Sequence, residues 1–179
     1  MRRLVKDVIL PVAVAVALAF VIQASVAKPY QIPTESMKPT ITANDRIIAN
    51  RVIYRVRDVD RGDIIVFDPT PSATRTCGDT QGDIPFVKRV IGLGGDLVEV
   101  KGGQTFVNGE EFVIEGAIPP DYEMRWERVP EDHLLVLGDN RSGSCDSHQW
   151  APDPFVPREN VIGQAEVTYW PPRSLTFLD

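Results

Sequence analysis

A serine between two prolines is the first candidate for chemistry in this sequence. Ser36 stands in I-P-T-E-S-M-K-P-T-I, with Pro33 and Pro39 on either side. The prolines restrict the backbone around them and keep the segment non-helical. A serine hydroxyl becomes an effective nucleophile only when a nearby base takes its proton. Taken alone, such a serine is more typical of a turn.

A lysine in an apolar strand is the second candidate. The run F-V-K-R-V-I-G places Lys88 on the same strand face as Phe86 and Val90. Burial disfavours the charged ammonium and lowers the pKa of a lysine toward the range of a general base. The alternative is an edge-strand lysine that prevents aggregation. Arg89 falls on the opposite face, where we expect solvent.

A polar loop after a short apolar strand is the third candidate. It runs G-D-N-R-S-G-S-C-D-S-H from Gly138 to His148. By itself the run is also consistent with a turn rich in Asp and Asn.

Together these segments resemble type I signal peptidases, the membrane-anchored Ser-Lys endopeptidases that remove signal peptides from exported preproteins. The resemblance covers nearly the whole chain and rests on four segments in order, which are P-T-E-S-M-K-P-T, G-D-I-I-V-F, F-V-K-R-V-I-G-L-G-G-D and G-D-N-R-S-G-S-C-D-S. It implies that Ser36 is the nucleophile and Lys88 the general base. It also implies that Thr34 joins the Ser36 backbone N–H in the oxyanion hole.

The resemblance makes Ser144 and Asp146 supporting groups beside the lysine. We expect the neutral Ser144 hydroxyl to hydrogen-bond the Lys88 amine and orient it. We expect Asp146 to stay out of direct contact, because a carboxylate on the amine would raise the lysine pKa. His148 stands where bacterial members usually carry Arg. The run S-C-D-S-H-Q-W-A-P is similar to the thylakoidal and cyanobacterial branch.

Substrates of that family carry small residues one and three places before the cut, which implies two shallow apolar pockets. We expect Ile32, Phe86 and Val87 to line them. The implied mechanism needs no metal and no cofactor.

The two cysteines, Cys77 and Cys145, allow three arrangements. The exported side of a membrane permits a disulfide between them. They could also be separate thiols, or join His133 and His148 as zinc ligands, although the usual close spacing of zinc ligands is missing.

An apolar run of about 20 residues, 8–27, is long enough to cross a bilayer as a single helix. Basic residues in the segment 1–7 favour a cytoplasmic N-terminus, which leaves 28–179 on the periplasmic or lumenal side of a plasma or thylakoid membrane. The lipid bilayer is thus an expected partner. A cleaved signal peptide ending at Ser25-Val26-Ala27 is the alternative.

The remainder, 28–179, is expected to be mainly β, as an antiparallel sheet or partly closed barrel with a hairpin insert at about 97–114. The candidate strands are 46–54, 63–67, 86–92, 97–101, 105–107, 111–114, 133–137 and 161–169. Segments 68–85 and 116–130 are expected to be surface loops.

Composition limits the partners and the size of the molecule. The chain has 179 residues, enough for one domain and an anchor. Its net charge of −6 argues against nucleic acid, and the −8 carried by the exported part argues against a basic lipid-binding patch. No oligomeric state is predicted. The other functions compatible with the motifs are a peptidase with one dedicated substrate, a soluble repressor that cleaves itself, and an inactive membrane-tethered binding protein.

Overall fold

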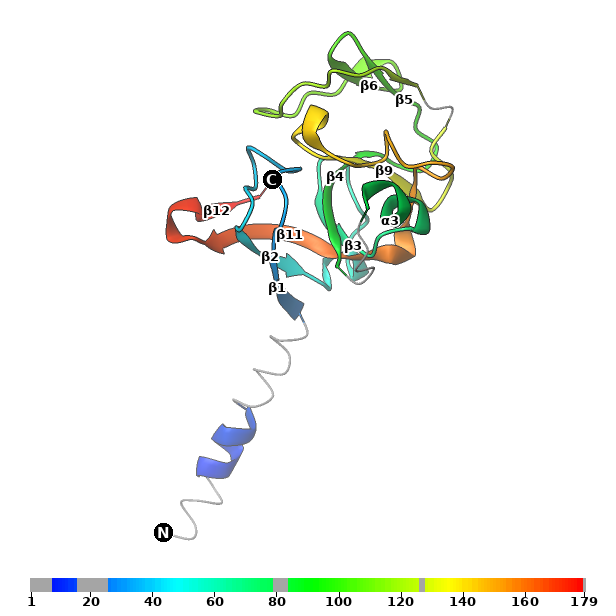
Figure 1. Ribbon diagram of the computed structural model, residues 1–179. Helices are drawn as coiled ribbons and strands as arrows, with labels where there is room; N and C mark the ends of the chain where they lie inside the picture. Colours follow the sequence, from blue (N-terminus) through cyan, green and yellow to red (C-terminus); the bar gives the residue numbers. More distant parts are fainter. Residues whose placement is uncertain (1–7, 16–25, 79–83, 126–127, 179) are drawn as a thin grey trace.

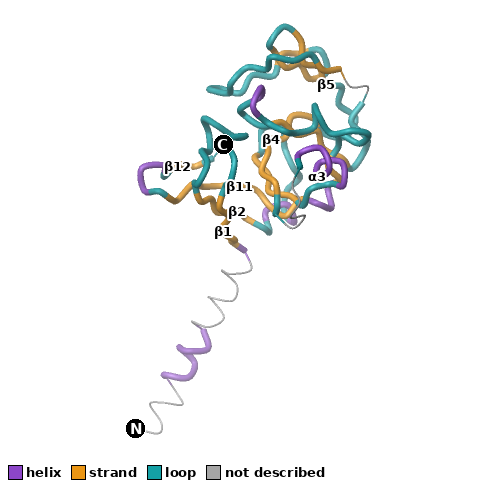
Figure 2. The backbone as a smooth tube through the Cα atoms, in the orientation of Figure 1, coloured by secondary structure: helices purple, strands orange, loops and turns teal. Residues whose placement is uncertain are grey.

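The computed structural model describes residues 8–15, 26–78, 84–125 and 128–178. Twelve strands form two antiparallel sheets, with short 3-10 helices and one α-helix between them (Figures 1 and 2). The prediction of a mainly β, antiparallel protein is therefore confirmed for this part of the chain.

The larger sheet carries the candidate site. Its strands follow the order β1-β2-β11-β3-β4-β9-β10, and β12 pairs with β11. Their bounds are β1 Ala27–Gln31, β2 Arg46–Asn50, β3 Ile64–Phe67, β4 Phe86–Gly92, β9 His133–Leu137, β10 Val156–Pro157, β11 Val161–Trp170 and β12 Thr176–Phe177. The central strands β3 and β4 are close together in the sequence. Their other partners are distant, because β3 also pairs with β11 and β4 with β9, each more than 40 residues downstream.

Both faces of this sheet are covered. All four residues of β3 are buried, with Ile64 and Val66 in one core cluster and Ile65 and Phe67 in another. A strand in the middle of such a sheet is buried on both sides, so alternation alone does not indicate which face meets solvent.

The smaller sheet contains the hairpin predicted at about 97–114 and adds a strand, β8, from the segment 116–130 that was predicted to be a loop. Its order is β7-β6-β5-β8, with bounds β5 Val98–Lys101, β6 Gln104–Val107, β7 Glu110–Glu111 and β8 Met124–Arg125. The turn between β5 and β6 uses Gly102 and Gly103 at positive φ angles of 58° and 78°. Glycine adopts this conformation without strain, which explains the tight hairpin.

Several boundaries differ from the sequence predictions. The strand predicted at 46–54 ends at Asn50, because the Asn50 side chain accepts hydrogen bonds from the backbone N–H groups of Val52 and Ile53 and turns the chain into a 3-10 helix, η2 Ile53–Arg55. The strand predicted at 111–114 is the short β7. The strand β1 and the short strands β8, β10 and β12 were not predicted.

The loop predicted at 68–85 contains a helix, α3 Pro71–Cys77. Thr70 caps it by accepting a hydrogen bond from the Ala73 N–H, and Pro71 occupies the first helical position. These are ordinary helix-start signals, but at seven residues the helix is too short to give a clear apolar period.

Most of the predicted membrane span lies outside the described residues. Residues 8–15 are helical, 16–25 are not described, and Ala27 already belongs to β1, where it pairs with Asn50. Over the described ranges, no helix has both the length and the apolar character needed to cross a bilayer. Besides η2, the described residues contain three further 3-10 helices, η3 Arg141–Gly143, η4 Arg158–Asn160 and η5 Pro172–Ser174.

Candidate active site

Ser36 lies on the segment that leaves β1 and is fixed to the core on both sides. Ile32 makes backbone hydrogen bonds to Asp45 and Asn44, and Met37 is fully buried one residue after the serine. Ser36 itself is only 8% exposed. The apolar neighbours thus hold the hydroxyl at a fixed point near the sheet.

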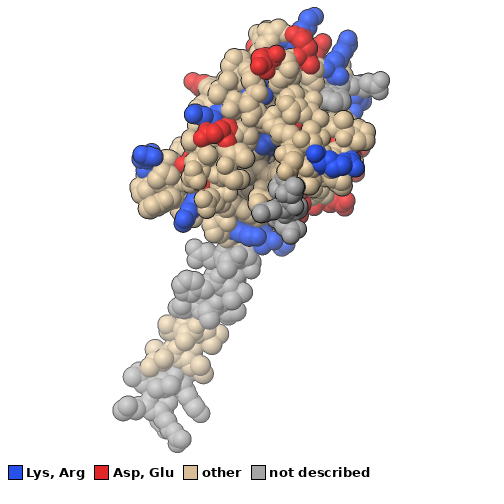
Figure 3. Space-filling view, in the orientation of Figure 1, with Lys and Arg blue, Asp and Glu red and all other residues tan. Residues whose placement is uncertain are grey.

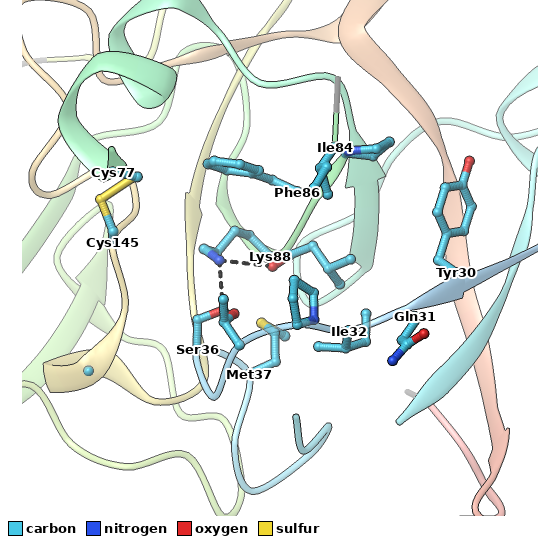
Figure 4. Close-up of a pocket in the computed structure, with 15 residues that line it drawn as sticks. Tyr30, Gln31, Ile32, Ser36, Met37, Cys77, Ile84, Phe86, Lys88 and Cys145 are labelled. Carbon is cyan, nitrogen blue, oxygen red and sulfur yellow. Dashed lines mark hydrogen bonds between the residues drawn. A yellow bond between two sulfur atoms is a disulfide. The ribbon is translucent and has the colours of Figure 1, made fainter. Parts of the chain in front are cut away.

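Lys88 lies in the middle of β4 and reaches that hydroxyl. Its Nζ is 2.8 Å from Ser36 Oγ and 3.1 Å from the Val87 carbonyl oxygen (Figure 4). The lysine side chain is buried, and Phe86 lies on the same side of the strand with its ring centroid 5.7 Å from Nζ. The structure therefore brings together two residues that are 52 positions apart in sequence.

Burial makes the Lys88 amine a base near neutral pH. Desolvation lowers the pKa of Lys88 from 10.5 to about 8, although the negative charges of Asp146 and Asp139 oppose this shift. The net effect fits a group that must be neutral to accept a proton from a serine hydroxyl.

Thr34 lies beside the same hydroxyl. Its Oγ1 donates a hydrogen bond of 3.2 Å to Ser36 Oγ. A hydroxyl donor this near Ser36 Oγ would lie close to the oxyanion that an attack of Ser36 on a carbonyl group would form.

The two expected supporting residues, Ser144 and Asp146, both contact Gly138 next to Ser36, but the predicted hydrogen bond from Ser144 to Lys88 is absent from the described structure. Ser144 Oγ is buried and has no hydrogen-bond partner among the described residues, so it does not orient the Lys88 amine. The Val87 carbonyl and Ser36 hold the amine instead. Ser144 packs instead against Gly138, where an added Cβ would overlap both the Ser144 hydroxyl and the Ser36 carbonyl oxygen.

Asp146 makes no hydrogen bond or ion pair with Lys88 in the part of the chain described. Its fully buried carboxylate accepts the Gly138 N–H at 2.8 Å and contacts the His148 ring at 2.7 Å. It affects the lysine only through space.

Arg89 was predicted to face solvent, because it lies on the strand face opposite Lys88. This prediction is wrong. It is 4% exposed and binds Asp139 through two nitrogen atoms, each at 2.8 Å. Thr40 donates a further hydrogen bond of 2.5 Å to the Asp139 carboxylate. This buried ion pair connects β4 to the start of the loop 138–148. The sequence did not predict it, because strand alternation does not show that the face of β4 carrying Arg89 is covered by other residues.

A cavity of about 420 Å³ opens on Ser36 and Lys88. Its wall is mainly apolar and includes the three predicted residues Ile32, Phe86 and Val87. Tyr30 and Ile84, which were not predicted, line it as well (Figure 4). The face of the domain in Figure 3 is hollowed near its centre, and the surface around the hollow carries few charged side chains. Such a cavity suits an extended, apolar peptide segment.

A disulfide joins Cys77, the last residue of α3, to Cys145 in the loop 138–148. Both cysteines line the cavity. The Trp150 indole N–H contacts the Cys77 sulfur, which packs this bridge against the core. Because the two sulfur atoms are bonded to each other, they are not available as the zinc ligands considered above.

Comparison with known proteins gives one consistent picture. The family described as "Signal peptidase, peptidase S26" matches residues 5–170. "Signal peptidase I" of Leptolyngbya laminosa is 45% identical over 163 residues, which cover 89% of this chain and 77% of that protein. "Probable signal peptidase I-2" of Synechocystis sp. is 46% identical over 88% of this chain and 69% of its own length.

More distant similarities are also present. "Probable thylakoidal processing peptidase 2, chloroplastic" of Arabidopsis thaliana is 39% identical, over 90% of this chain and 43% of that protein. A crystal structure of a signal peptidase I from Enterococcus faecalis V583 is 26% identical and covers 61% of this chain and 97% of that one, with a TM-score of 0.47.

Proposed function

The chain belongs to the signal peptidase family, peptidase S26, and from this premise we propose how it cleaves its substrates. It is a serine peptidase that removes signal peptides. In our proposal Ser36 is the nucleophile and Lys88 the general base. The observation that carries this proposal is the 2.8 Å contact between Lys88 Nζ and Ser36 Oγ inside an apolar cavity.

In the acylation step, Ser36 Oγ attacks the scissile carbonyl carbon and Lys88 Nζ takes the hydroxyl proton. The resulting oxyanion is stabilised by the Thr34 hydroxyl and the Ser36 backbone N–H. The Lys88 ammonium then gives its proton to the leaving amine as the C–N bond breaks. A water molecule hydrolyses the acyl-enzyme, with Lys88 again accepting the proton and returning it to Ser36.

The cavity supports a preference for small residues one and three places before the cut. Ile32, Phe86 and Val87 line the cavity close to Ser36 with apolar groups. The cavity volume of about 420 Å³ leaves little room for two large side chains together with the peptide backbone. A preprotein with Ala at both positions is therefore the first substrate to test.

The same proposal includes a membrane anchor at 8–27 with the catalytic part on the periplasmic or lumenal side. Ser36 follows Ala27 by nine residues, and an extended strand rises about 3.3 Å per residue. The nucleophile would then lie no more than about 30 Å from the end of the anchor, within reach of a signal peptide cleaved close to the bilayer. An N-terminal sequence that begins at Lys28 in the isolated protein would contradict the retained anchor.

The decisive experiment incubates the full-length, detergent-solubilised protein with that preprotein and reads the new N-terminus by mass spectrometry. We expect one cut after the second Ala, and no cut with Ser36→Ala or Lys88→Ala. Matched controls are Ser142→Ala and Lys38→Ala, because both side chains are exposed. Cleavage by a folded Ser36→Ala or Lys88→Ala variant at the wild-type rate would refute the assignment.

A further inference from the structure

His148 closes the loop 138–148 with a contact to a fully buried carboxylate. Its ring nitrogen Nδ1 lies 2.7 Å from Asp146 Oδ1, and its backbone N–H contacts the same oxygen at 3.3 Å. The imidazole side chain is 9% exposed, so the contact is shielded from water. On its other side the ring stacks on Tyr122, with centroids 3.9 Å apart and an interplanar angle of 6°.

The same carboxylate holds the backbone that supports the nucleophile. Asp146 Oδ2 accepts the Gly138 N–H at 2.8 Å, and Gly138 packs directly against the Ser36 carbonyl oxygen. Two residues further on, the Asn140 N–H donates to that carbonyl oxygen at 3.1 Å. A short chain of contacts thus runs from His148 through Asp146 and Gly138 to Ser36.

We propose that His148 is a positioning residue for the peptidase reaction, which holds Asp146 and, through it, the Gly138 backbone against Ser36. This inference rests on the proposed roles of Ser36 and Lys88. His148 does not line the cavity, so it acts through Asp146 and not through substrate contact.

The charge of the imidazole also matters, because Asp146 affects the base. The Asp146 carboxylate raises the pKa of Lys88, against the larger effect of burial. A cationic group at position 148 offsets part of the Asp146 charge in addition to the Arg141 cation, whereas a neutral group there does not. The bond to Asp146 and the charge at position 148 therefore have separable effects, one on the position of Ser36 and one on the fraction of neutral lysine.

The other groups facing His148 and Asp146 do not supply this balance in the same way. Tyr122 remains a neutral phenol, because burial and the Asp146 charge raise its pKa. Arg141 is a buried cation whose Nη1 is directed to Thr105, and Asp139 is already paired with Arg89. Of these groups, His148 has the direct contact with the Asp146 carboxylate.

The test uses the full-length protein and three substitutions at one position. His148→Ala removes the contact, His148→Asn keeps an N–H donor near Nδ1 without charge, and His148→Arg supplies a permanent cation that can stack on Tyr122. The matched control is His133→Ala, because the His133 ring contacts the Glu131 carbonyl oxygen at the start of β9 and no hydrogen bond links it to Asp146 in the described part of the chain. The readouts are kcat and KM for preprotein cleavage from pH 6 to pH 10, with thermal unfolding of each variant.

We expect His148→Ala to lower kcat by roughly ten- to a hundredfold, the loss that corresponds to one hydrogen bond to a charged group, with KM within about twofold of the wild type. His148→Arg should recover most of kcat, and its acid limb should lie at lower pH than that of His148→Asn. His133→Ala should match the wild type.

Two results would overturn the inference. One is a His148→Ala variant with the wild-type kcat and pH profile. The other is folded His148→Asn and His148→Arg variants that are both as slow as His148→Ala and share its pH profile. If His148→Ala itself does not fold, the Asn and Arg variants are compared with the wild type, and the same kcat and pH profile in all three proteins would overturn the inference. Failure of the proposed function is distinct, since it would appear as activity in Ser36→Ala or Lys88→Ala.

Discussion

Replacing the buried lysine by methionine tests the energetic basis of the proposed base. Lys88→Met keeps an unbranched side chain of similar length and removes the amine. In the folded protein burial lowers the Lys88 pKa from 10.5 to about 8. A shift of this size corresponds to about 3 kcal/mol of unfolding free energy that the wild-type protein loses at neutral pH by holding the amine in the core.

Part of this gain is offset in the variant. The amine contacts the Val87 carbonyl oxygen and Ser36 Oγ, and losing these contacts costs on the order of 1 kcal/mol each. We therefore expect Lys88→Met to be more stable than the wild type by about 1 to 2 kcal/mol at pH 7.

The sign of the pH dependence follows from the lowered pKa. Below about pH 8 both folded and unfolded wild-type chains bind the proton, and the full penalty for burying it applies. Between pH 8 and 10.5 the folded chain has lost the proton while the unfolded chain still binds it, so the wild type gains stability as pH rises. The advantage of Lys88→Met should thus shrink by about 2 kcal/mol between pH 7 and pH 10.

The assay is urea unfolding of the full-length protein in a non-ionic detergent, followed by tryptophan fluorescence at pH 7 and pH 10. Lys38→Met is the control, because the Lys38 side chain is 53% exposed and its replacement should give no such pH-dependent gain. A Lys88→Met advantage that is absent at pH 7, or that is the same at both pH values, would refute the reasoning that burial depresses the Lys88 pKa.

Three further predictions follow from the same geometry. First, kcat/KM of the wild type should rise about tenfold from pH 7 to pH 9, because the neutral fraction of a lysine with a pKa of about 8 rises from about a tenth to about nine tenths; a flat profile in a stopped-flow peptide assay would contradict a Lys88 base. Second, Thr34→Val should slow acylation roughly a hundredfold in single-turnover experiments while substrate binding stays intact, because it removes one oxyanion donor; Thr34→Ser is the control, and equal rates for Val and Ser would exclude that role. Third, Cys77→Ser with Cys145→Ser should lower the unfolding free energy by about 4 kcal/mol, since the bridge closes a loop with a sequence separation of 68 residues; an unchanged urea midpoint would show that the bridge does not stabilise the fold.

Local sequence patterns were sufficient for much of the architecture. The strands Phe86–Gly92 and His133–Leu137 have the predicted bounds, since both are rich in β-branched and other apolar residues, and β4 ends at a glycine while β9 is followed by one. The hairpin at Gly102-Gly103 follows from backbone conformations that glycine favours. Ser36, Lys88 and Asp146 were likewise singled out from motifs, although their roles in catalysis remain proposals.

Contacts between distant segments required the tertiary structure. Alternation along β4 correctly separates Lys88 from Arg89, but it gives no information about what covers each face. Arg89 is buried because Asp139, 50 residues away, provides a matching charge in the core. Ser144 was expected on the Lys88 amine, but its hydroxyl packs at Gly138 and leaves the amine to Ser36 and the Val87 carbonyl oxygen.

The amino-acid sequence by itself thus determined the bounds of β4 and β9, the place of the Gly102-Gly103 turn and which motifs mark the family, because these depend on residues close together in the chain. The tertiary structure decided how far Lys88 is desolvated, how near it lies to Ser36 and which partner Asp146 takes. These properties depend on packing between β4, the Ser36 segment and the loop 138–148. The physical reason is that a pKa or a hydrogen bond is set by the surroundings of a group in space, and most of the surroundings of Lys88 come from residues 50 or more positions away in the chain.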